Sequence, residues 1–321
     1  MYVLELVGEH DAFAAYEASS VAAGVHRVAP GIAKATMIQS AVSHLGFTRR
    51  ALFEVDETRS HIDAITTAVR TTPLDRRGTV AVRARGIRGG RIDTRAVERA
   101  VGQVLVDQNF DIDLEAPNHE LHVIVVGDRA YIGWLVAASE ASFSARRPTD
   151  RPFFQPGSMA PRLARALVMI AGARPGVSIL DPMCGTGGVI IEAALVGART
   201  YGFDIQAQMV AGTQRNCAAY ASGADVTVGS ADATRLPFRD EAFDSVVFDA
   251  PYGRQSRIAT ARGDLLTDAF GEARRVARQA VVVSDRQCDD TIRDAGWQIR
   301  AAFERRVHRS LTRYIYHLVE A

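Results

Sequence analysis

The sequence is poor in cysteine, contains a single lysine, Lys34, and has no long uninterrupted apolar segment. Its three cysteines lie far apart and form no CxxC pair, so we expect a reducing compartment and no zinc or other metal site. No apolar run reaches the roughly 18 residues that a membrane-spanning helix needs. Charge also appears too early in the N-terminal MYVLELVGEHD for a secretory signal, so we expect a soluble, cytoplasmic protein without membrane contact.

The net charge of +1 gives no indication of a polyanionic partner, but the basic residues are unevenly distributed. Residues 70–99 hold nine arginines against three acidic residues, and a second basic cluster lies at 300–313. Local basic clusters on a nearly neutral protein are typical of selective nucleic-acid binders. For either cluster taken alone, an ordinary solvated surface is the simpler interpretation.

Residues 1–143 alternate short strand-like and helix-like segments, which is typical of a small α+β region. We expect one helix from residue 11 to Gly24 and another at 94–108 with an apolar stripe, and we find no catalytic constellation in this half. The next segment, 144–152, combines two prolines with charged residues and no apolar pattern. It is predicted to be a linker between domains.

Residues 153–321 follow a different pattern. Five short apolar runs are separated by helix-length segments: VSILD, TYGFDI, ADVTVG, SVVFDA and AVVVSD. Strands that alternate with helices predict βαβ units and a parallel sheet covered by helices on both faces. Ligands of such sheets bind beyond the carboxyl ends of the strands. Four of these strands end at or just before an acidic residue or a glycine, so the sequence indicates a site at that edge.

The first of these strands ends at Asp181 and continues into a glycine-containing loop, PMCGTGG, before an apolar helix. Gly185 and Gly187 let the main chain pass close to a ligand, beside the free N–H groups of the helix. A plain turn, a nicotinamide dinucleotide loop and an S-adenosylmethionine loop all use glycines in this way. Ile190 stands where the dinucleotide motif has its third glycine. Asp181 suits the cationic amino group of S-adenosylmethionine and opposes a pyrophosphate, which favours the third interpretation.

Two further aspartates follow the second and third strands. Asp204 lies 23 residues after Asp181 and can accept hydrogen bonds from both hydroxyls of a ribose. This spacing serves NAD and S-adenosylmethionine alike. Asp232 can contact an adenine amino group, although on its own it is a common turn-forming residue. Together these positions indicate an adenosine cofactor without choosing between the two.

The fourth strand ends in FDAPYG, which places Asp249 at the carboxyl edge of the sheet. Pro251 keeps Ala250 extended, and Tyr252 offers a flat face on which a base can stack. The exocyclic amino group of a nucleobase is a poor nucleophile. The Asp249 carboxylate and the Ala250 carbonyl can hold its two N–H groups and aim its lone pair at a methyl donor, after which Asp249 accepts the proton. An ordinary strand-to-turn transition explains these four residues alone about as well, but not their order after the other aspartates.

Several segments together resemble the archaeal tRNA guanine-N2-methyltransferases that modify guanosine 10: RPFFQPGSMAPRLARALV, LDPMCGTGG, FDIQAQMV, DAPYGRQS and HRSLTRYIY. The resemblance is close over the catalytic half and loose before it. Ala250 departs from the usual D/N-P-P-Y motif of amino-group methyltransferases but keeps the backbone carbonyl. The resemblance implies an α/β class I methyltransferase domain at 153–321, Rossmann-like, with a mostly parallel sheet and an antiparallel last strand. Before it we expect a ferredoxin-like element at 1–50 and a THUMP RNA-binding domain at 51–143.

The same resemblance implies S-adenosylmethionine as cofactor, tRNA as substrate, and one or two methyl transfers to guanine N2. It implies catalytic positions at Asp249, Ala250, Pro251 and Tyr252. It implies cofactor-binding positions at Ser158, Asp181, Cys184, Gly185, Gly187, Asp204, Ile205, Asp232, Ala233 and Asp249. For RNA contacts we expect Arg83, Arg85, Arg88, His308, Arg309 and Arg313.

Two of these positions also have simpler interpretations. Ser158 is predicted to cap a helix that has Pro161 in its first turn, while in the family this loop closes over the methionine end of the cofactor. Cys184 fits a small apolar residue in a tight loop better than a nucleophile, because no histidine lies near it in sequence.

Other functions stay open at this point. The chain fits a methyltransferase acting on another RNA guanosine or on a DNA base amino group, and, in a different class, a noncatalytic RNA-binding protein. A nicotinamide oxidoreductase is disfavoured by Ile190. The sequence does not indicate the oligomeric state, the number of methyl groups transferred, or the need for a small activating protein partner.

Overall fold

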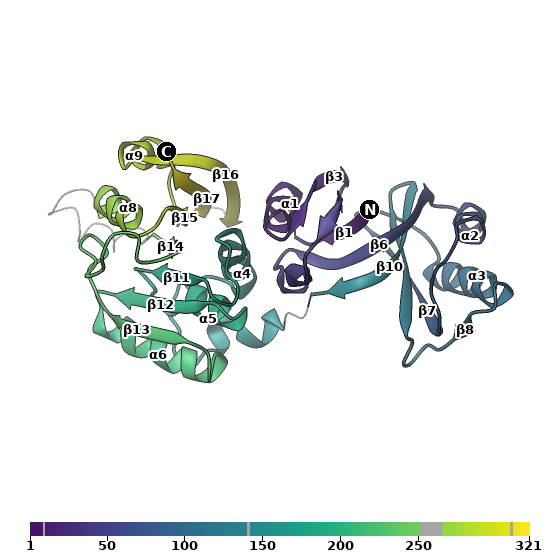
Figure 1. The fold of residues 1–321 in the computed structure, drawn as a ribbon, viewed down its shortest axis with the longest axis horizontal. Helices are drawn as coiled ribbons and strands as arrows, with labels where there is room; N and C mark the ends of the chain where they lie inside the picture. The colour runs from purple at the N-terminus through teal and green to yellow at the C-terminus, as the bar shows by residue number, and fades with distance from the viewer. Residues whose placement is uncertain (9, 140–141, 251–264, 309–310) are drawn as a thin grey trace. The chain divides into compact units, whose positions relative to one another are not determined.

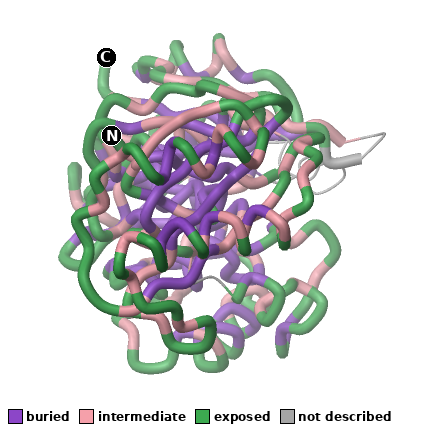
Figure 2. Tube along the Cα trace, turned by 90° about the vertical axis from the view of Figure 1, so that its right-hand side faces the viewer, coloured by how far each residue is buried: buried purple, intermediate pink, exposed green. Residues whose placement is uncertain are grey.

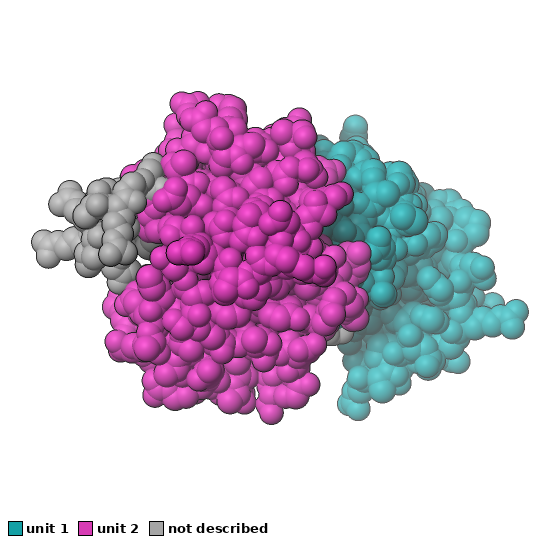
Figure 3. Space-filling model, turned by 60° about the vertical axis from the view of Figure 1, so that its left-hand side comes forward, with its two compact units in different colours: residues 1–140 teal, residues 141–321 magenta. Residues whose placement is uncertain are grey.

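A computed structural model describes the chain apart from residues 9, 140–141, 251–264 and 309–310. The chain forms two compact units, residues 1–140 and 141–321, which Figure 3 colours separately. Buried residues run mainly along strands and the inner sides of helices, and exposed residues along the connecting turns (Figure 2). Within the described ranges, no helix combines the length and the apolar character that crossing a membrane requires.

The first unit is built on one eight-stranded sheet in the order β3-β4-β1-β6-β10-β9-β7-β8 (Figure 1). Its strands are β1 Tyr2–Leu6, β3 His26–Ala29, β4 Ile32–Ala35, β6 Thr48–Arg59, β7 Thr79–Ile87, β8 Asp111–Ile112, β9 His119–Val126 and β10 Arg129–Ala138. A separate short pair consists of β2 Ala22–Ala23 and β5 Met37–Ile38. The helices are α1 Asp11–Ala18, α2 Ile62–Thr71 and α3 Thr94–Asp107, with a 3-10 turn η1 Ser40–His44.

Helices α2 and α3 pack against each other and against strands β6 and β7. Val97, Val101, Val104 and Leu105 form the buried side of α3, so the predicted apolar stripe is confirmed. They join Ile65 of α2 and the apolar residues of β7, β9 and β10 in one core.

The end of the first helix differs from the prediction. Helix α1 ends at Ala18, six residues before Gly24, where the side chains of Ser19 and Ser20 donate hydrogen bonds back to helix carbonyls. The boundary predicted at residue 50 falls inside β6, so residues 1–50 and 51–143 contribute strands to one sheet.

The second unit holds a seven-stranded sheet in the order β13-β12-β11-β14-β15-β17-β16. Its strands are β11 Ser178–Asp181, β12 Arg199–Asp204, β13 Val226–Ser230, β14 Ser245–Asp249, β15 Gln279–Ser284, β16 Trp297–His308 and β17 Leu311–Glu320. Strands β11 to β15 are parallel, while β17 is antiparallel to both β15 and β16. The predicted Rossmann-like sheet with an antiparallel last strand is therefore confirmed.

Helices cover both faces of this sheet. α4 Pro161–Ile170, α5 Gly188–Leu195 and α6 Ala207–Tyr220 pack in sequence on one face, and α8 Leu265–Val276 and α9 Asp289–Asp294 pack together on the other. Ile190, Ile191 and Cys217 belong to the core under α5 and α6, and Phe270 and Trp297 to the core on the α8 side. This two-sided covering explains why strands β14 and β15 are apolar on both faces.

The segment 144–152, predicted as a linker, belongs to the second unit. It contains most of the 3-10 turn η2 Phe143–Arg146 and all of η3 Pro148–Asp150. Arg151 is buried and directs a guanidinium nitrogen to the Thr186 hydroxyl. The prolines and charges that indicated a free linker therefore form a structured edge of the methyltransferase fold.

Candidate active site

The carboxyl ends of β11, β12, β13 and β14 lie along one edge of the second sheet, because these strands are parallel neighbours. A cavity of about 880 Å³ opens at this edge, a size typical of small-molecule sites. The predicted site residues that line it are Ser158, Asp181, Cys184, Gly185, Asp204, Ile205, Asp232, Ala233, Asp249 and Ala250. The sheet order thus brings together positions that span about ninety residues of sequence.

Asp181 is the last residue of β11 and is almost fully buried. One of its carboxylate oxygens accepts a hydrogen bond from the Met183 N–H at 3.1 Å. Burial raises the pKa of Asp181 well above its ordinary value, and the carboxylates of Asp204 and Asp249 raise it further. A cationic group bound beside Asp181 would relieve this repulsion, so the position favours a positively charged ligand.

The loop after Asp181 depends on its glycines. Gly185 and Gly187 have φ angles of +52° and +78°, which glycine adopts far more readily than other residues. Gly187 is the N-cap of α5, and a Cβ atom on it would lie 2.8 Å from the Thr213 side chain of α6. Cys184 is buried, and this burial raises the pKa of its thiol well above the ordinary value. Its environment is that of an apolar packing residue, as the sequence suggested.

Asp204 ends β12 and connects two parts of the cavity wall. Its carboxylate accepts the Gly185 N–H at 3.0 Å with one oxygen and the Gln206 N–H at 2.9 Å with the other. Each carboxylate oxygen has a second lone pair, so both can still accept a ligand hydroxyl. Ile205 follows with 67% of its surface exposed at the cavity, where an apolar group of a ligand can cover it.

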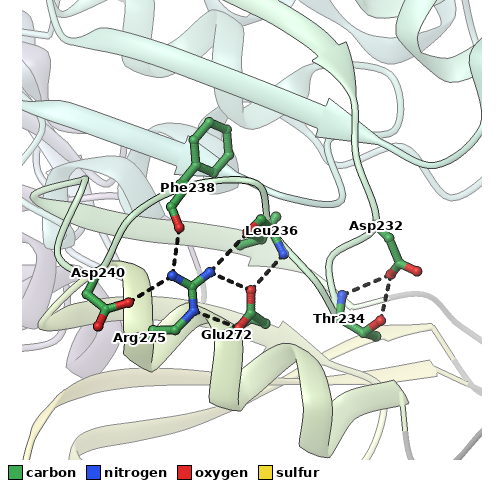
Figure 4. A network of polar contacts seen from close by, with 7 residues as sticks. All are labelled: Asp232, Thr234, Leu236, Phe238, Asp240, Glu272 and Arg275. Carbon is green, nitrogen blue, oxygen red and sulfur yellow. Dashed lines mark hydrogen bonds and ion pairs between the residues drawn. The ribbon is translucent and has the colours of Figure 1, made fainter.

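Asp232 lies in the loop that leaves β13. One of its oxygens accepts hydrogen bonds from both the N–H and the hydroxyl of Thr234, so it forms the turn that the sequence offered as the simpler interpretation. The loop is fixed from behind by Arg275 of α8 (Figure 4). The Arg275 side chain donates to two carbonyls and two carboxylates, those of Leu236, Phe238, Asp240 and Glu272. Asp232 and Ala233 are therefore held at the cavity by a network that lies outside it.

Asp249 ends β14, with 18% of its side chain exposed. Burial raises its pKa to about 7, the Arg313 guanidinium opposes this rise, and the Asp285 carboxylate adds to it. A group with this pKa accepts and releases a proton near neutral pH. Ala250 is buried and donates its N–H to the Val283 carbonyl of β15, which fixes the backbone direction at this point. Pro251 and Tyr252 lie outside the described residues.

The loop of residues 155–159 also lines the cavity. Ser158 does not cap α4, since the N-cap is Ala160 and Pro161 is the first helical residue. Instead, the Ser158 hydroxyl donates to the Gln155 carbonyl at 2.6 Å and accepts from the Thr186 hydroxyl at 3.0 Å. The serine thus joins this loop to the glycine loop.

The arginines of β7 that were predicted to contact RNA pair with acidic residues of the same unit. Arg83 contacts Glu120 at 3.3 Å, and Arg85 contacts the buried Glu5 at 3.2 Å. Arg88 lies 3.1 Å from Asp11. Their first role is therefore structural, because each one neutralises a carboxylate within the fold.

The C-terminal residues predicted to contact RNA differ from one another. Arg309 and the side chain of His308 lie outside the described part of the structure. Arg313 lies on β17, is 7% exposed, and reaches Asp249 rather than solvent. The alternation of β17 turns this side chain inward, and its contact with phosphate stays a prediction.

Some cavity residues were not singled out from the sequence. They are Met183, Thr186, Gln206, Met209, Leu265 and Asp268. The first four flank glycine or aspartate positions that were identified, so their proximity in sequence was an available signal. Leu265 and Asp268 belong to α8, and only the folding of this helix over the sheet edge brings them to the cavity.

The charge of the cavity wall decides between the candidate ligands. Five aspartates line it, Asp181, Asp204, Asp232, Asp249 and Asp268, and the lining residues that the structure describes include no lysine, arginine or histidine. A nicotinamide dinucleotide would bring a pyrophosphate into this field, at a large electrostatic cost. S-adenosylmethionine carries a sulfonium and an ammonium group together with a ribose and an adenine, and the residues present fit it.

Comparisons with known proteins agree with this geometry. The family model described as "RMKL-like, methyltransferase domain" matches residues 148–315. A tRNA (guanine(10)-N2)-dimethyltransferase of Methanothermobacter thermautotrophicus is 37% identical over 246 residues, which cover 74% of this chain and 72% of the relative. The enzyme of the same name from Pyrococcus abyssi is 31% identical over 246 residues, 75% of this chain and 74% of the relative.

Among solved structures, TrmN from Thermus thermophilus has a TM-score of 0.53 at 20% identity and covers 100% of this chain and 99% of its own. At this identity the match concerns the fold alone. The family model and the sequence relatives confirm the predicted enzyme class and its cofactor, S-adenosylmethionine. This chain belongs to the tRNA (guanine(10)-N2)-dimethyltransferase family and carries its RMKL-like methyltransferase domain.

Proposed function

We propose that this protein methylates the exocyclic N2 amino group of guanosine 10 in tRNA, with one or two methyl groups transferred. The reaction type is supported by Asp249, a carboxylate with a pKa of about 7 at the end of β14 in a cavity suited to a cationic cofactor. The base and the RNA are supported by the names of the relatives, which act on guanine N2.

Bound S-adenosylmethionine supplies an electrophilic methyl group. Asp249 accepts an N–H hydrogen bond from the guanine amino group and so orients its lone pair, and the Ala250 carbonyl accepts the second. S-adenosylmethionine held by the cavity aspartates would supply the methyl group to N2, and Asp249 would take the proton that N2 gives up. Pro251 and Tyr252 keep the roles predicted for them, a stiff backbone and a stacking surface for the flipped base.

The remaining aspartates hold the cofactor in this proposal. Asp181 lies where it can neutralise the ammonium group, and Asp204 accepts hydrogen bonds from the ribose hydroxyls. Asp232 accepts from the adenine amino group with the oxygen that does not bind Thr234. Ile205 covers one face of the adenine, since it is the most exposed large apolar residue of the wall.

We assign tRNA binding to residues 51–143, as a THUMP domain, with residues 1–50 as a ferredoxin-like element beside it, in a cytoplasmic protein. Because Arg83, Arg85 and Arg88 pair internally, phosphate contacts fall to the exposed arginines of the same basic segment. On α3, Arg95 and Arg99 are exposed and lie four residues apart, on the side opposite the buried stripe. Phosphate contacts of this kind position an RNA without reading its sequence.

The test is to incubate an unmodified tRNA transcript with the enzyme and methyl-labelled S-adenosylmethionine, then to map the labelled nucleoside. We expect N2-methylguanosine or N2,N2-dimethylguanosine at position 10. A transcript with inosine at position 10 keeps the ring but lacks the N2 amino group, so it should lose the label.

Each other outcome has a defined meaning. Label at position 6 would overturn the proposed target position but support the proposed guanine-N2 methylation. A relative from Thermus thermophilus, 31% identical over 212 residues, is named for position 6. Label on a base other than guanine, or no label on any RNA while S-adenosylmethionine binds, would overturn the proposed function.

A further inference from the structure

Arg313 occupies an unusual position for a charged residue. On β17 it alternates with Ile315 and His317, and all three side chains are buried. A guanidinium in such a row needs a compensating group, because an isolated buried charge is costly. On the neighbouring β16 its register partner is Arg305, which supplies no negative charge. The compensating groups are the Asp249 carboxylate and the Gly157 carbonyl oxygen.

Two oxygens from different parts of the site lie near the same nitrogen of Arg313. Its Nη2 atom is 3.4 Å from Oδ2 of Asp249 and 3.4 Å from the Gly157 carbonyl oxygen. Asp249 is the acceptor at the end of β14, and Gly157 belongs to the loop of residues 155–159. Arg313 therefore connects the reactive carboxylate to a loop that also lines the cavity.

Asp249 also has acidic neighbours. Asp181 lies at the end of the neighbouring β11, Asp285 follows β15, and Asp268 of α8 lines the same cavity. Burial disfavours ionisation of Asp249, and the Asp285 carboxylate acts in the same direction. Arg313 opposes both effects, with its Nη2 atom 3.4 Å from Oδ2 of Asp249.

We propose that Arg313 is a positioning residue that keeps the Asp249 carboxylate ionised and fixed in direction, and that it couples this carboxylate to the 155–159 loop. The inference rests on the proposed amino-group methylation. Arg313 itself touches neither the base nor the transferred methyl group. Its effect passes through the proton affinity of Asp249 and through the position of the loop.

This role predicts a specific pH dependence. Asp249 must be deprotonated to accept a hydrogen bond and then a proton from the amino group, so the rate rises with pH through about 7. A positive charge beside a carboxylate lowers its pKa, so removing that charge raises it. The rising limb of the profile then moves to higher pH, by about one pH unit or more for a contact at this distance.

The experiment measures kcat for tRNA methylation between pH 5.5 and 9.5, a range that brackets a pKa near 7 and its expected rise, in the wild type and in Arg313→Gln, Arg313→Met and Arg313→Lys. We expect the two neutral variants to lose about 5-fold or more at pH 7, because a pKa about one unit higher leaves only about a tenth of the Asp249 carboxyl ionised there, and to recover part of the loss above pH 8.5. Arg313→Lys should stay near the wild-type profile because it keeps the charge. S-adenosylmethionine binding by calorimetry reports whether each variant is folded.

Two further variants control for indirect effects. Ile315→Val removes one buried methylene from the same row of β17 without changing charge, so the pH dependence of its kcat should match that of the wild type. Asp285→Asn removes an exposed negative charge near Asp249 and should move the limb in the opposite direction, to lower pH.

The outcomes separate the two proposals. An unlabelled tRNA with the wild-type enzyme contradicts the proposed function itself. If the wild type is active and a neutral variant binds S-adenosylmethionine with the rising part of its pH profile unchanged, only the proposed role of Arg313 is overturned. If the neutral variants do not fold, a folded Arg313→Lys enzyme that is equally inactive at every pH overturns it as well.

Discussion

One buried acid of the first unit and two buried acids at the cavity of the second unit differ in how their charge is compensated. In the first unit, Glu5 is 3% exposed and lies within 2.9 Å of Arg50 and 3.2 Å of Arg85. In the second, Asp181 and Asp204 are equally well buried, yet the contacts described for them are hydrogen bonds from backbone N–H groups. Glu5 is neutralised within its unit, whereas Asp181 and Asp204 present acidic groups at the cavity.

This difference separates structural charge from functional charge. A compensated carboxylate contributes to folding and needs no ligand. An uncompensated cluster of carboxylates is costly unless a cation arrives, so its persistence at a cavity points to binding or catalysis. The arginines of β7 looked like ligand-binding residues in the sequence, but their carboxylate partners place them in the structural group.

The largest expected effect comes from the acid nearest the chemistry. Asp249→Asn keeps the shape of the side chain but removes its negative charge and its ability to take a proton. We expect kcat for tRNA methylation to fall about 10²- to 10⁴-fold, while the Kd for S-adenosylmethionine changes less than about 3-fold. Initial rates and calorimetry measure the two quantities, with exposed Asp294→Asn as the control. Equal loss of transfer and cofactor binding would show that Asp249 is structural.

A second variant tests the acid that faces the cofactor. Asp204→Asn should weaken S-adenosylmethionine binding about 10- to 100-fold, because the carboxylate accepts charge-assisted hydrogen bonds and orders the Gly185 N–H. The unfolding temperature without cofactor should change little. Asp225→Asn, an exposed acid just before β13, is the matched control. An unchanged Kd in the Asp204 variant would remove this residue from the cofactor site.

The acid of the first unit should respond in the reverse way. Glu5→Gln leaves Arg50 and Arg85 without their shared carboxylate, and because both arginines are partly exposed we expect a loss of about 1–3 kcal/mol in the free energy of unfolding. Urea denaturation measures this loss, and exposed Glu115→Gln should show almost none. Cofactor affinity should stay at the wild-type value. A strong loss of cofactor binding in a folded Glu5 variant would contradict the distinction between this structural acid and the cavity acids.

The smallest expected effect concerns the exposed arginines of α3. The double variant Arg95→Glu, Arg99→Glu should weaken tRNA binding several-fold and make its salt dependence shallower by about one unit of slope per lost phosphate contact. Filter binding at several salt concentrations measures both. Reversing two exposed arginines of the other unit, Arg174 and Arg239, is the matched control. The same loss in both double variants would indicate nonspecific attraction rather than a binding surface on α3.

Much of the catalytic unit was predictable because its signals are local. Strand ends at Asp181, Asp204 and Asp249 follow apolar runs that only a buried parallel strand explains, and the structure places all three at one edge. The glycine loop was equally readable, since positive φ angles restrict the residue type.

The parts that sequence could not supply depend on pairing across the fold. Arg85 and Glu5 are eighty residues apart, and the sequence around either residue does not indicate that the two side chains pair. The inward direction of the Arg313 side chain depends on which face of β17 is buried. The alternation of Arg313 with Ile315 could have indicated that face from the sequence. Residue 50 lies inside β6, and the segment 144–152 belongs to the second unit. Composition could indicate neither fact, because it reports polarity, whereas sheet pairing determines which segments pack together.

The hydrogen bond from Gly185 to Asp204 has a consequence for the energetics of cofactor capture. It fixes the glycine loop and the ribose-facing carboxylate to each other within the protein alone, and the Gln206 N–H holds the other oxygen of the same carboxylate. The rotational freedom of these groups is therefore lost during folding and not when the ligand arrives. A pocket rigid in advance should bind S-adenosylmethionine and its demethylated product with similar ordering cost, so that the lost positive charge on sulfur governs which of the two leaves.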